Sequence, residues 1–350
     1  MPAQPLELRK ISMSPSLIRG LVALLVTGPA VAAPRTTRDV DICTSPRIRR
    51  AWHTLRDEEK KAYIDAELCL MSTPATLGLR GSRTKFDELQ SAHVLKMEIA
   101  HFTGQFLPFH RLFVWAHEQA LRNVCGFTGT QPYWAEELDV GAFSKSMLLD
   151  PVLGFGGDGT GPERCIRDGP FVNYTNPLGP GFEISDHCIN RQINDTLTMT
   201  AAPAVVEGCV NMPTFLTFWS CIENKGPHSA GHSGVGAQMS NPISSPGDPL
   251  FYLHHAWLDR IWRKWQLKDP EVRDKEMGGN NRANLSSRVP PPGVTPVNLT
   301  RPADIPEPLI VGDAGNVTTL NHLLYLYGLV ENRTIGEVMD PSKVLCYGYD

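Results

Sequence analysis

The chain contains the stretch Asp248-Pro-Leu-Phe-Tyr-Leu-His-His-Ala-Trp-Leu-Asp-Arg-Ile-Trp262. An aspartate at the beginning of a helix accepts hydrogen bonds from backbone N–H groups that have no partner inside the helix. We therefore predict a capped helix that runs from Pro249 to Gln266. It carries His255 beside an aromatic-rich run.

Five more histidines precede this helix and complete two groups of three. His93, His101 and His110 form the first group, and His228 and His232 join His255 in the second. Residues four apart on a helix share one face, so His228 and His232 can hold one ion together. A single His-X-X-X-His pair is weak evidence, because imidazoles that cap a helix or face solvent give the same spacing. Two groups of three predict two metal centres.

Apolar residues at helical spacing predict further helices around the first histidine group. Residues 46–70 predict a helical hairpin in which Asp57 caps the second helix, and residues 86–101 and 106–122 predict two more helices. Residues 126–211 are rich in glycine and proline and predict long loops. The histidines thus lie in a helical region that is interrupted by irregular chain.

The N-terminus predicts secretion. Basic residues precede a short apolar run that ends in small residues near Ala33, which is typical of a signal peptide and too short to span a bilayer. We predict a signal peptide at residues 1–33, a single catalytic domain at residues 34–350, and no membrane span after the signal is removed. Removal changes the formal charge from −4 to about −6 without leaving a basic stripe, which argues against a nucleic acid partner.

Cysteines and glycosylation motifs also favour the secretory pathway. All eight cysteines follow residue 33 and none forms a CxxC pair, which favours disulfides over zinc and leaves the pairing open. The Asn-X-Ser/Thr motifs begin at Asn173, Asn194, Asn284, Asn298, Asn316 and Asn332. The sequence therefore predicts a secreted, disulfide-bonded glycoprotein.

The histidines stand in long, ordered motifs. His101 is followed by Phe106-Leu-Pro-Phe-His-Arg-Leu-Phe113, and His232 is followed by Gly236-Ala-Gln-Met239 and then by the stretch quoted first. This order resembles the tyrosinase, catechol oxidase and haemocyanin family of type-3 copper proteins, up to a closing Tyr-Gly-Tyr at residues 347–349. The resemblance implies a mainly α fold with an antiparallel four-helix bundle core that houses two copper ions, long loops and a few short strands.

The resemblance also implies which residues bind copper. One ion is assigned to His93, His101 and His110, and the other to His228, His232 and His255. His254, the first of the His-His pair, is then left with a packing or supporting role. A bound imidazole usually donates its other N–H to an oxygen, for which backbone carbonyls, Asp259 or Glu118 are candidates. Asp259 is equally suited to an ion pair with Arg260, and Glu118 to fixing its helix.

The implied reaction is the oxidation of o-diphenols to o-quinones with dioxygen. The resemblance allows hydroxylation of a monophenol as well, including a phenol within a larger natural product of fungal secondary metabolism or pigment formation. A dioxygen carrier uses the same six histidines, and a secreted structural glycoprotein with a lapsed metal site is a further alternative. The complete set of histidines favours the phenol oxidase.

Two departures from the family pattern bear on the reaction. Ser229 follows the first histidine of the second group, where many hydroxylating tyrosinases have an asparagine that helps a glutamate-bound water deprotonate the phenol. Glu223 is the candidate glutamate, although an exposed loop carboxylate is an equal interpretation. The usual Pro-Tyr-Trp-Asp-Trp motif is here Pro-Tyr-Trp-Ala-Glu at residues 132–136, which puts the role of that aspartate in doubt. We therefore expect o-diphenol oxidation to predominate.

Overall fold

The computed structural model describes residues 43–224, 226–284 and 297–350. The predicted signal peptide at residues 1–33 lies outside this part of the chain. Within the described ranges, we find no helix that combines the length and the apolar character needed to cross a membrane.

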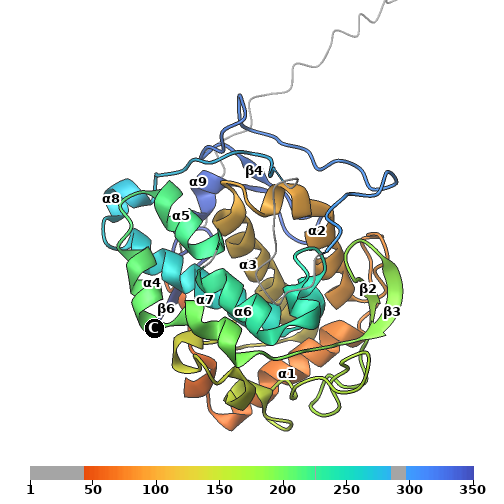
Figure 1. The fold of residues 1–350 in the computed structure, drawn as a ribbon. Coiled ribbons are helices and arrows are strands. Elements are labelled where there is room, and N and C mark those ends of the chain that lie inside the picture. Colours follow the sequence, from red (N-terminus) through yellow and green to blue (C-terminus); the bar gives the residue numbers. More distant parts are fainter. Residues whose placement is uncertain (1–42, 225, 285–296) are drawn as a thin grey trace, which may run out of the picture. The chain divides into compact units, whose positions relative to one another are not determined.

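The described residues are mainly helical, which confirms the predicted fold class (Figure 1). The α-helices are α1 (Asp57–Ser72), α2 (Lys85–Ala100), α3 (Phe106–Cys125), α4 (Pro203–Val210), α5 (Phe215–Asn224), α6 (Pro227–Val235), α7 (Leu250–Gln266), α8 (Pro270–Arg273) and α9 (Ile335–Val338). The strands are β1 (Arg47–Arg49), β2 (Thr175–Leu178), β3 (Ile184–Cys188), β4 (Leu323–Leu324), β5 (Arg333–Thr334) and β6 (Tyr347–Tyr349). Short 3₁₀ helices and the β2–β3 hairpin occupy the predicted loop region before α4.

The core is formed by α2, α3, α6 and α7 (Figure 1). Helix α3 packs against both α2 and α7, and α6 packs against α7. Every residue of α7 is buried except Arg260, Arg263 and Lys264. A helix that is apolar around most of its circumference belongs inside a protein, and α7 is the central element of this fold.

Acidic side chains fix where the histidine-bearing helices begin. The N-cap residue of α7 is Pro249, one position after the predicted Asp248, but Asp248 still accepts a hydrogen bond from the N–H of Leu250 at 3.0 Å and another from Arg191 Nε at 2.7 Å. At α2, Thr84 accepts from the N–H of Asp87 at 3.2 Å while Asp87 accepts from the N–H of Thr84 at 2.8 Å. Such reciprocal caps satisfy N–H groups that a helix leaves unpaired.

The predicted helical hairpin over residues 46–70 is wrong in its first half. Residues 47–49 form β1, which pairs in parallel with β6 at the other end of the chain, and Trp52 begins a 3₁₀ turn. Helix α1 has Arg56 rather than Asp57 as its N-cap residue. The apolar residues of this segment have helical spacing. Pairing with β6, 300 residues away, satisfies the backbone hydrogen-bonding groups that a helix would satisfy, and it overrides the local preference for a helix.

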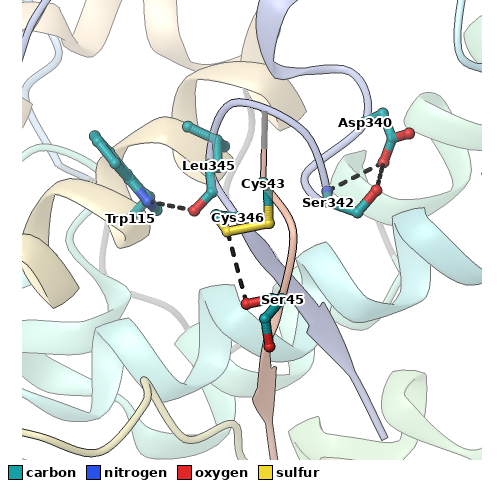
Figure 2. The surroundings of a disulfide bond; sticks show 7 residues. All are labelled: Cys43, Ser45, Trp115, Asp340, Ser342, Leu345 and Cys346. Atoms are coloured by element: carbon teal, nitrogen blue, oxygen red, sulfur yellow. Dashed lines mark hydrogen bonds between the residues drawn. A yellow bond between two sulfur atoms is a disulfide. The ribbon is translucent and has the colours of Figure 1, made fainter. Parts of the chain in front are cut away.

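All eight cysteines are paired, which confirms the expected disulfides and resolves their pairing. The bonds are Cys43–Cys346, Cys69–Cys125, Cys165–Cys188 and Cys209–Cys221. Figure 2 shows Cys43–Cys346 beside the paired strands β1 and β6, where the nearby Trp115 donates to the carbonyl of Leu345 at 2.9 Å. Disulfides of this number are typical of secretory proteins.

Candidate metal centre

The structure gathers the predicted histidines into two groups. His93 of α2, His101 at the C-terminal end of α2 and His110 of α3 have ring nitrogens that all lie within 4.8 Å of one another. A second group with the same spacing contains His228 and His232 of α6 together with His254 and His255 of α7. Helices α2 and α3 thus supply one group, and α6 and α7 supply the other.

The two groups face each other. The rings of His110 and His255 are stacked with centroids 4.1 Å apart, and the rings of His101 and His228 lie 6.4 Å apart. The helices bring together residues that are more than a hundred positions apart in the sequence. The result is one binuclear site rather than two separate ones.

Backbone carbonyls orient four of the imidazoles. Nδ1 of His93 lies 2.9 Å from the carbonyl oxygen of Ile243, and Nδ1 of His110 lies 2.8 Å from that of Phe106. On α6, Nδ1 of His232 lies 2.6 Å from the carbonyl oxygen of Met239, and Nδ1 of His228 lies 3.4 Å from that of Glu223. Because a carbonyl only accepts, each Nδ1 carries the proton, and the lone pair is on Nε2.

Three of these four Nε2 atoms are without a hydrogen-bond partner among the described residues. Nε2 of His93, His110 and His228 is buried and forms no hydrogen bond, whereas most buried polar atoms in proteins have one. Nε2 of His232 instead lies 3.2 Å from Nε2 of His255. Two imidazole nitrogens bound tetrahedrally to one ion at about 2.0–2.1 Å would be separated by roughly 3.3 Å. The unpaired nitrogens therefore fit metal ligation.

Burial keeps the imidazoles neutral. Loss of solvation disfavours the imidazolium and lowers the pKa of His93 to about 4. The same cause lowers the pKa of His101, His110, His228, His232 and His255 well below the usual value. A metal ion binds the neutral form, so no proton has to be displaced near neutral pH.

The histidines of α6 are the least buried of the six. His93, His101, His110 and His255 are buried, whereas His228 and His232 are partly exposed. Ser229, which follows His228, is also partly exposed.

The structure decides between the candidate acceptors for the ligand imidazoles. Backbone carbonyls take this role, whereas Asp259 accepts from Arg111 Nε at 2.6 Å and Glu118 accepts from Arg49 at 2.6 Å. The alternative pairing of Asp259 with Arg260 is also wrong, since Arg260 lies 3.6 Å from Glu137. Both carboxylates belong to a buried charge network behind the site.

His254 differs from the other histidines of its group because it contacts a carboxylate. Its Nδ1 lies 2.5 Å from Oε1 of Glu136, and both side chains are buried. Glu136 stands one position after Ala135, which replaces the aspartate of the usual motif. Gly231 makes room for the pair, because a Cβ there would lie 2.1 Å from Nδ1 of His254. Sequence reasoning noticed the substitution but did not predict this contact, which connects residues 118 positions apart.

Glu223 is not an exposed loop residue. It lies on α5 and is 3% exposed, and its carboxylate accepts from the N–H of Phe102 and from Trp219 Nε1, each at 2.5 Å. Its backbone carbonyl oxygen lies 3.4 Å from Nδ1 of His228. The structure therefore places Glu223 beside the histidines, with Ser229 one residue beyond His228.

Comparisons with known proteins agree with this geometry. Residues 83–268 match the common central domain of tyrosinase. The chain is 35% identical over 267 residues to the tyrosinase-like protein phomQ1 of Diaporthe leptostromiformis, covering 70% of this chain and 68% of that protein. It is 32% identical to tyrosinase ustQ of Aspergillus flavus, covering 90% of this chain and 82% of that protein.

A solved structure shares the fold. A polyphenol oxidase from Thermothelomyces thermophila superposes with a TM-score of 0.72 at 26% sequence identity. The match covers 87% of this chain and 89% of that protein. The likeness therefore extends well beyond the histidine motifs.

Proposed function

Because the chain belongs to the tyrosinase family of copper-dependent phenol oxidases, we propose that it uses dioxygen to oxidise o-diphenols to o-quinones. The observation that carries this proposal is the pair of facing imidazole groups, in which neutral rings present unpaired nitrogens to a shared space. The family's cofactor is a pair of copper ions, and imidazole is a suitable ligand for copper.

We assign His93, His101 and His110 to one copper ion and His228, His232 and His255 to the other. His254 is left out, because the family resemblance assigns the second histidine of the His-His pair to copper, and Nε2 of His255 lies 3.2 Å from that of His232. When bound there, the copper pair supplies the electrons that reduce dioxygen and accepts electrons from the phenol. Six neutral ligands leave the positive charge of the ions uncompensated, which favours an anionic phenolate.

The surrounding residues position the substrate and exclude water. Phe251 lies 4.1 Å from the ring of His255 and Phe106 lies 4.8 Å from that of His228, so apolar rings border the imidazoles. We propose that Glu223 and Ser229 hold a water that takes the phenol proton. Two N–H donors already engage the carboxylate of Glu223, and a serine hydroxyl replaces the asparagine amide. The water held by Glu223 and Ser229 is therefore a weak base, which favours oxidation of diphenols over hydroxylation of monophenols.

Monophenol hydroxylation is the second candidate, because relatives from Aspergillus flavus and Aspergillus terreus are named tyrosinases. The fungal origin of these relatives supports the expected role in secondary metabolism or pigment formation. We further propose that residues 34–350 form one secreted catalytic domain after removal of the signal peptide, and that some of the Asn-X-Ser/Thr motifs carry glycans. The disulfides support the secretory pathway.

Oxygen uptake tests the proposed function. The purified full chain, loaded with copper, should contain two copper ions and consume dioxygen when catechol is added. Uptake with tyrosine should be much slower. Absence of uptake with any phenol at full copper loading would contradict the enzyme and favour a dioxygen carrier, which should instead bind oxygen reversibly. Equal rates with tyrosine and catechol would establish the second candidate.

Replacing Ser229 with asparagine tests the proposed base. We expect Ser229→Asn to raise the ratio of tyrosine to catechol turnover by about tenfold, a modest part of the roughly 100-fold to 10,000-fold that a positioned base contributes. The matched control is Ser229→Ala, which should leave the ratio at or below that of the unmodified protein. Both rates are measured by oxygen uptake. An unchanged ratio in the asparagine variant would mean that residue 229 does not assist deprotonation.

A further inference from the structure

One short segment supplies carbonyl acceptors to both groups of histidines. Nδ1 of His93 lies 2.9 Å from the carbonyl oxygen of Ile243, and Nδ1 of His232 lies 2.6 Å from that of Met239. Both carbonyls belong to residues 237–244, between α6 and α7, which we call the acceptor segment. His93 is in the group from α2 and α3, whereas His232 is in the group from α6 and α7. The acceptor segment therefore orients one ligand of each assigned copper ion.

The other two oriented imidazoles do not depend on this segment. Nδ1 of His110 faces the carbonyl of Phe106, four residues earlier on α3. Nδ1 of His228 faces the carbonyl of Glu223, five residues earlier in the chain. Acceptors this close in the chain stay near their imidazoles, whereas the acceptor segment has to be held in place by contacts from elsewhere.

The side chain of Gln238 holds the acceptor segment. It is 5% exposed, and its Nε2 donates to the carbonyl of Ser244 at 2.8 Å. This bond closes the segment on itself, because Met239 directly follows Gln238 and Ile243 directly precedes Ser244. Oε1 of the same amide lies 2.9 Å from Nε2 of His187 on β3. Gln238 thus joins both ends of the acceptor segment to the β2–β3 hairpin.

Helix α2 and a constrained backbone also fix the segment. Gln90, one turn before His93, donates to the carbonyl of Ser244 at 2.9 Å, so two amide donors meet at an oxygen that has two lone pairs. Ala237 has a φ of 44°, in the left-handed region that residues other than glycine rarely adopt. Such a conformation persists only where the surrounding contacts determine it. The acceptor segment is therefore held in one conformation at both of its ends.

We propose that Gln238 is a positioning residue for both copper ions, because it fixes the segment whose carbonyls orient His93 and His232. A carbonyl that accepts from Nδ1 sets the tautomer of an imidazole and the direction of its Nε2 lone pair. When the acceptor segment shifts, both Nε2 lone pairs turn away from their ions together. The inference rests on the proposed copper assignment and adds a residue through which the two halves of the centre depend on each other.

Copper retention tests this inference in the copper-loaded full chain. Copper bound per protein is measured during titration with a chelator, together with the electron paramagnetic resonance signal of copper(II). Residues that orient a metal ligand typically contribute about 10–100-fold to metal affinity. We expect Gln238→Ala to weaken the retention of both ions by about tenfold. The signal should rise, because neighbouring copper(II) ions that pair their electron spins give none, whereas a misplaced or single ion does.

The matched control is Gln131→Ala. Gln131 is a buried amide outside the acceptor segment, and its Nε2 donates to the hydroxyl of Tyr63 at 2.9 Å while its Oε1 lies 2.8 Å from Nδ1 of His117. Its removal should lower the thermal midpoint and leave both copper ions as tightly bound as before. Equal loss of copper from this control would overturn the inference, because destabilisation alone would then release the ions. Full retention by Gln238→Ala, or the loss of one ion only, would overturn it as well.

A second variant decides the matter if Gln238→Ala does not fold. His187→Leu removes the contact to Oε1 from a partly exposed position on β3 and leaves Gln238 in place. It should weaken the retention of both ions by about threefold, the equivalent of one modest hydrogen bond, and unchanged retention would then overturn the inference. The unmodified protein tests the copper assignment separately. Fewer than two copper ions in it would contradict that assignment, whereas two ions that Gln238→Ala retains unchanged would contradict only the role of Gln238.

Discussion

Replacing His232 with alanine should abolish catechol oxidation and leave the protein with one copper ion instead of two. Nε2 of His232 lies 3.2 Å from Nε2 of His255, and its Nδ1 is held by the carbonyl of Met239. Without His232, only His228 and His255 remain of the three ligands assigned to the second copper ion. Loss of a residue that merely supports a ligand already costs about 10–100-fold in metal affinity or activity, so we expect a rate loss beyond about a hundredfold.

Copper content and oxygen uptake are measured together, so that loss of metal is separated from loss of turnover. The matched control is His254→Ala, which removes an imidazole from the same group of four. His254 faces Glu136, and we expect this variant to keep both copper ions while its thermal midpoint falls, because the buried carboxylate loses its partner. Retention of two copper ions by His232→Ala, or their loss from His254→Ala, would contradict the ligand assignment.

Much of this centre is predictable from the sequence because its signals are local. The spacing of His228 and His232 follows from the helical repeat, and Asp248 accepts a hydrogen bond at the start of α7 as its position in the sequence predicts. The choice between His254 and His255 is different, because only the family resemblance makes it from the sequence. In the structure His254 contacts Glu136 from a distant loop, and the absence of a side chain at Gly231 leaves room for this contact. No spacing of residues in the sequence predicts this contact.

The fold shows the same division between local and distant causes. Residues whose apolar neighbours recur at helical spacing within one segment, as in α2, α3 and α7, are predicted in the correct state. Residues 47–49 are not, because their partner is β6 at the far end of the chain. Likewise, four disulfides can be expected from eight cysteines, but their pairing depends on which helices and strands become neighbours.

Replacing Asp259 with asparagine should lower the free energy of unfolding by about 3–5 kcal/mol, the range for breaking a buried ion pair. Asp259 lies on α7, one turn after His255, and accepts from Arg111 Nε at 2.6 Å and from the hydroxyls of Tyr347 and Tyr349 at 2.5 and 2.7 Å. Arg49 lies 3.8 Å away and also pairs with Glu118. Two buried cations are thus balanced by two carboxylates, and the substitution leaves one positive charge uncompensated.

The pH dependence gives this prediction a second readout. Burial alone would raise the pKa of Asp259, but Arg111, Arg49 and the two tyrosine hydroxyls outweigh it and lower the pKa below its ordinary value. A carboxyl with a lowered pKa in the folded protein stabilises it above the unfolded-state pKa, which is about 3.9. This contribution is lost as the pH falls through the lower, folded-state value. The difference between the two proteins should therefore be full at pH 7 and shrink below about pH 4.

Urea denaturation at pH 7 and at decreasing pH measures both effects. The control is Asp65→Asn, which removes a carboxylate from an exposed pair with Lys61 and should change the unfolding midpoint far less, because solvent screens that pair. A small effect of Asp259→Asn at pH 7, or a difference that grows as the pH falls, would mean that the network does not depend on this charge. A large loss at pH 7 that shrinks at low pH would establish that the charge of Asp259 stabilises the contacts of β1, β6 and α3 with α7.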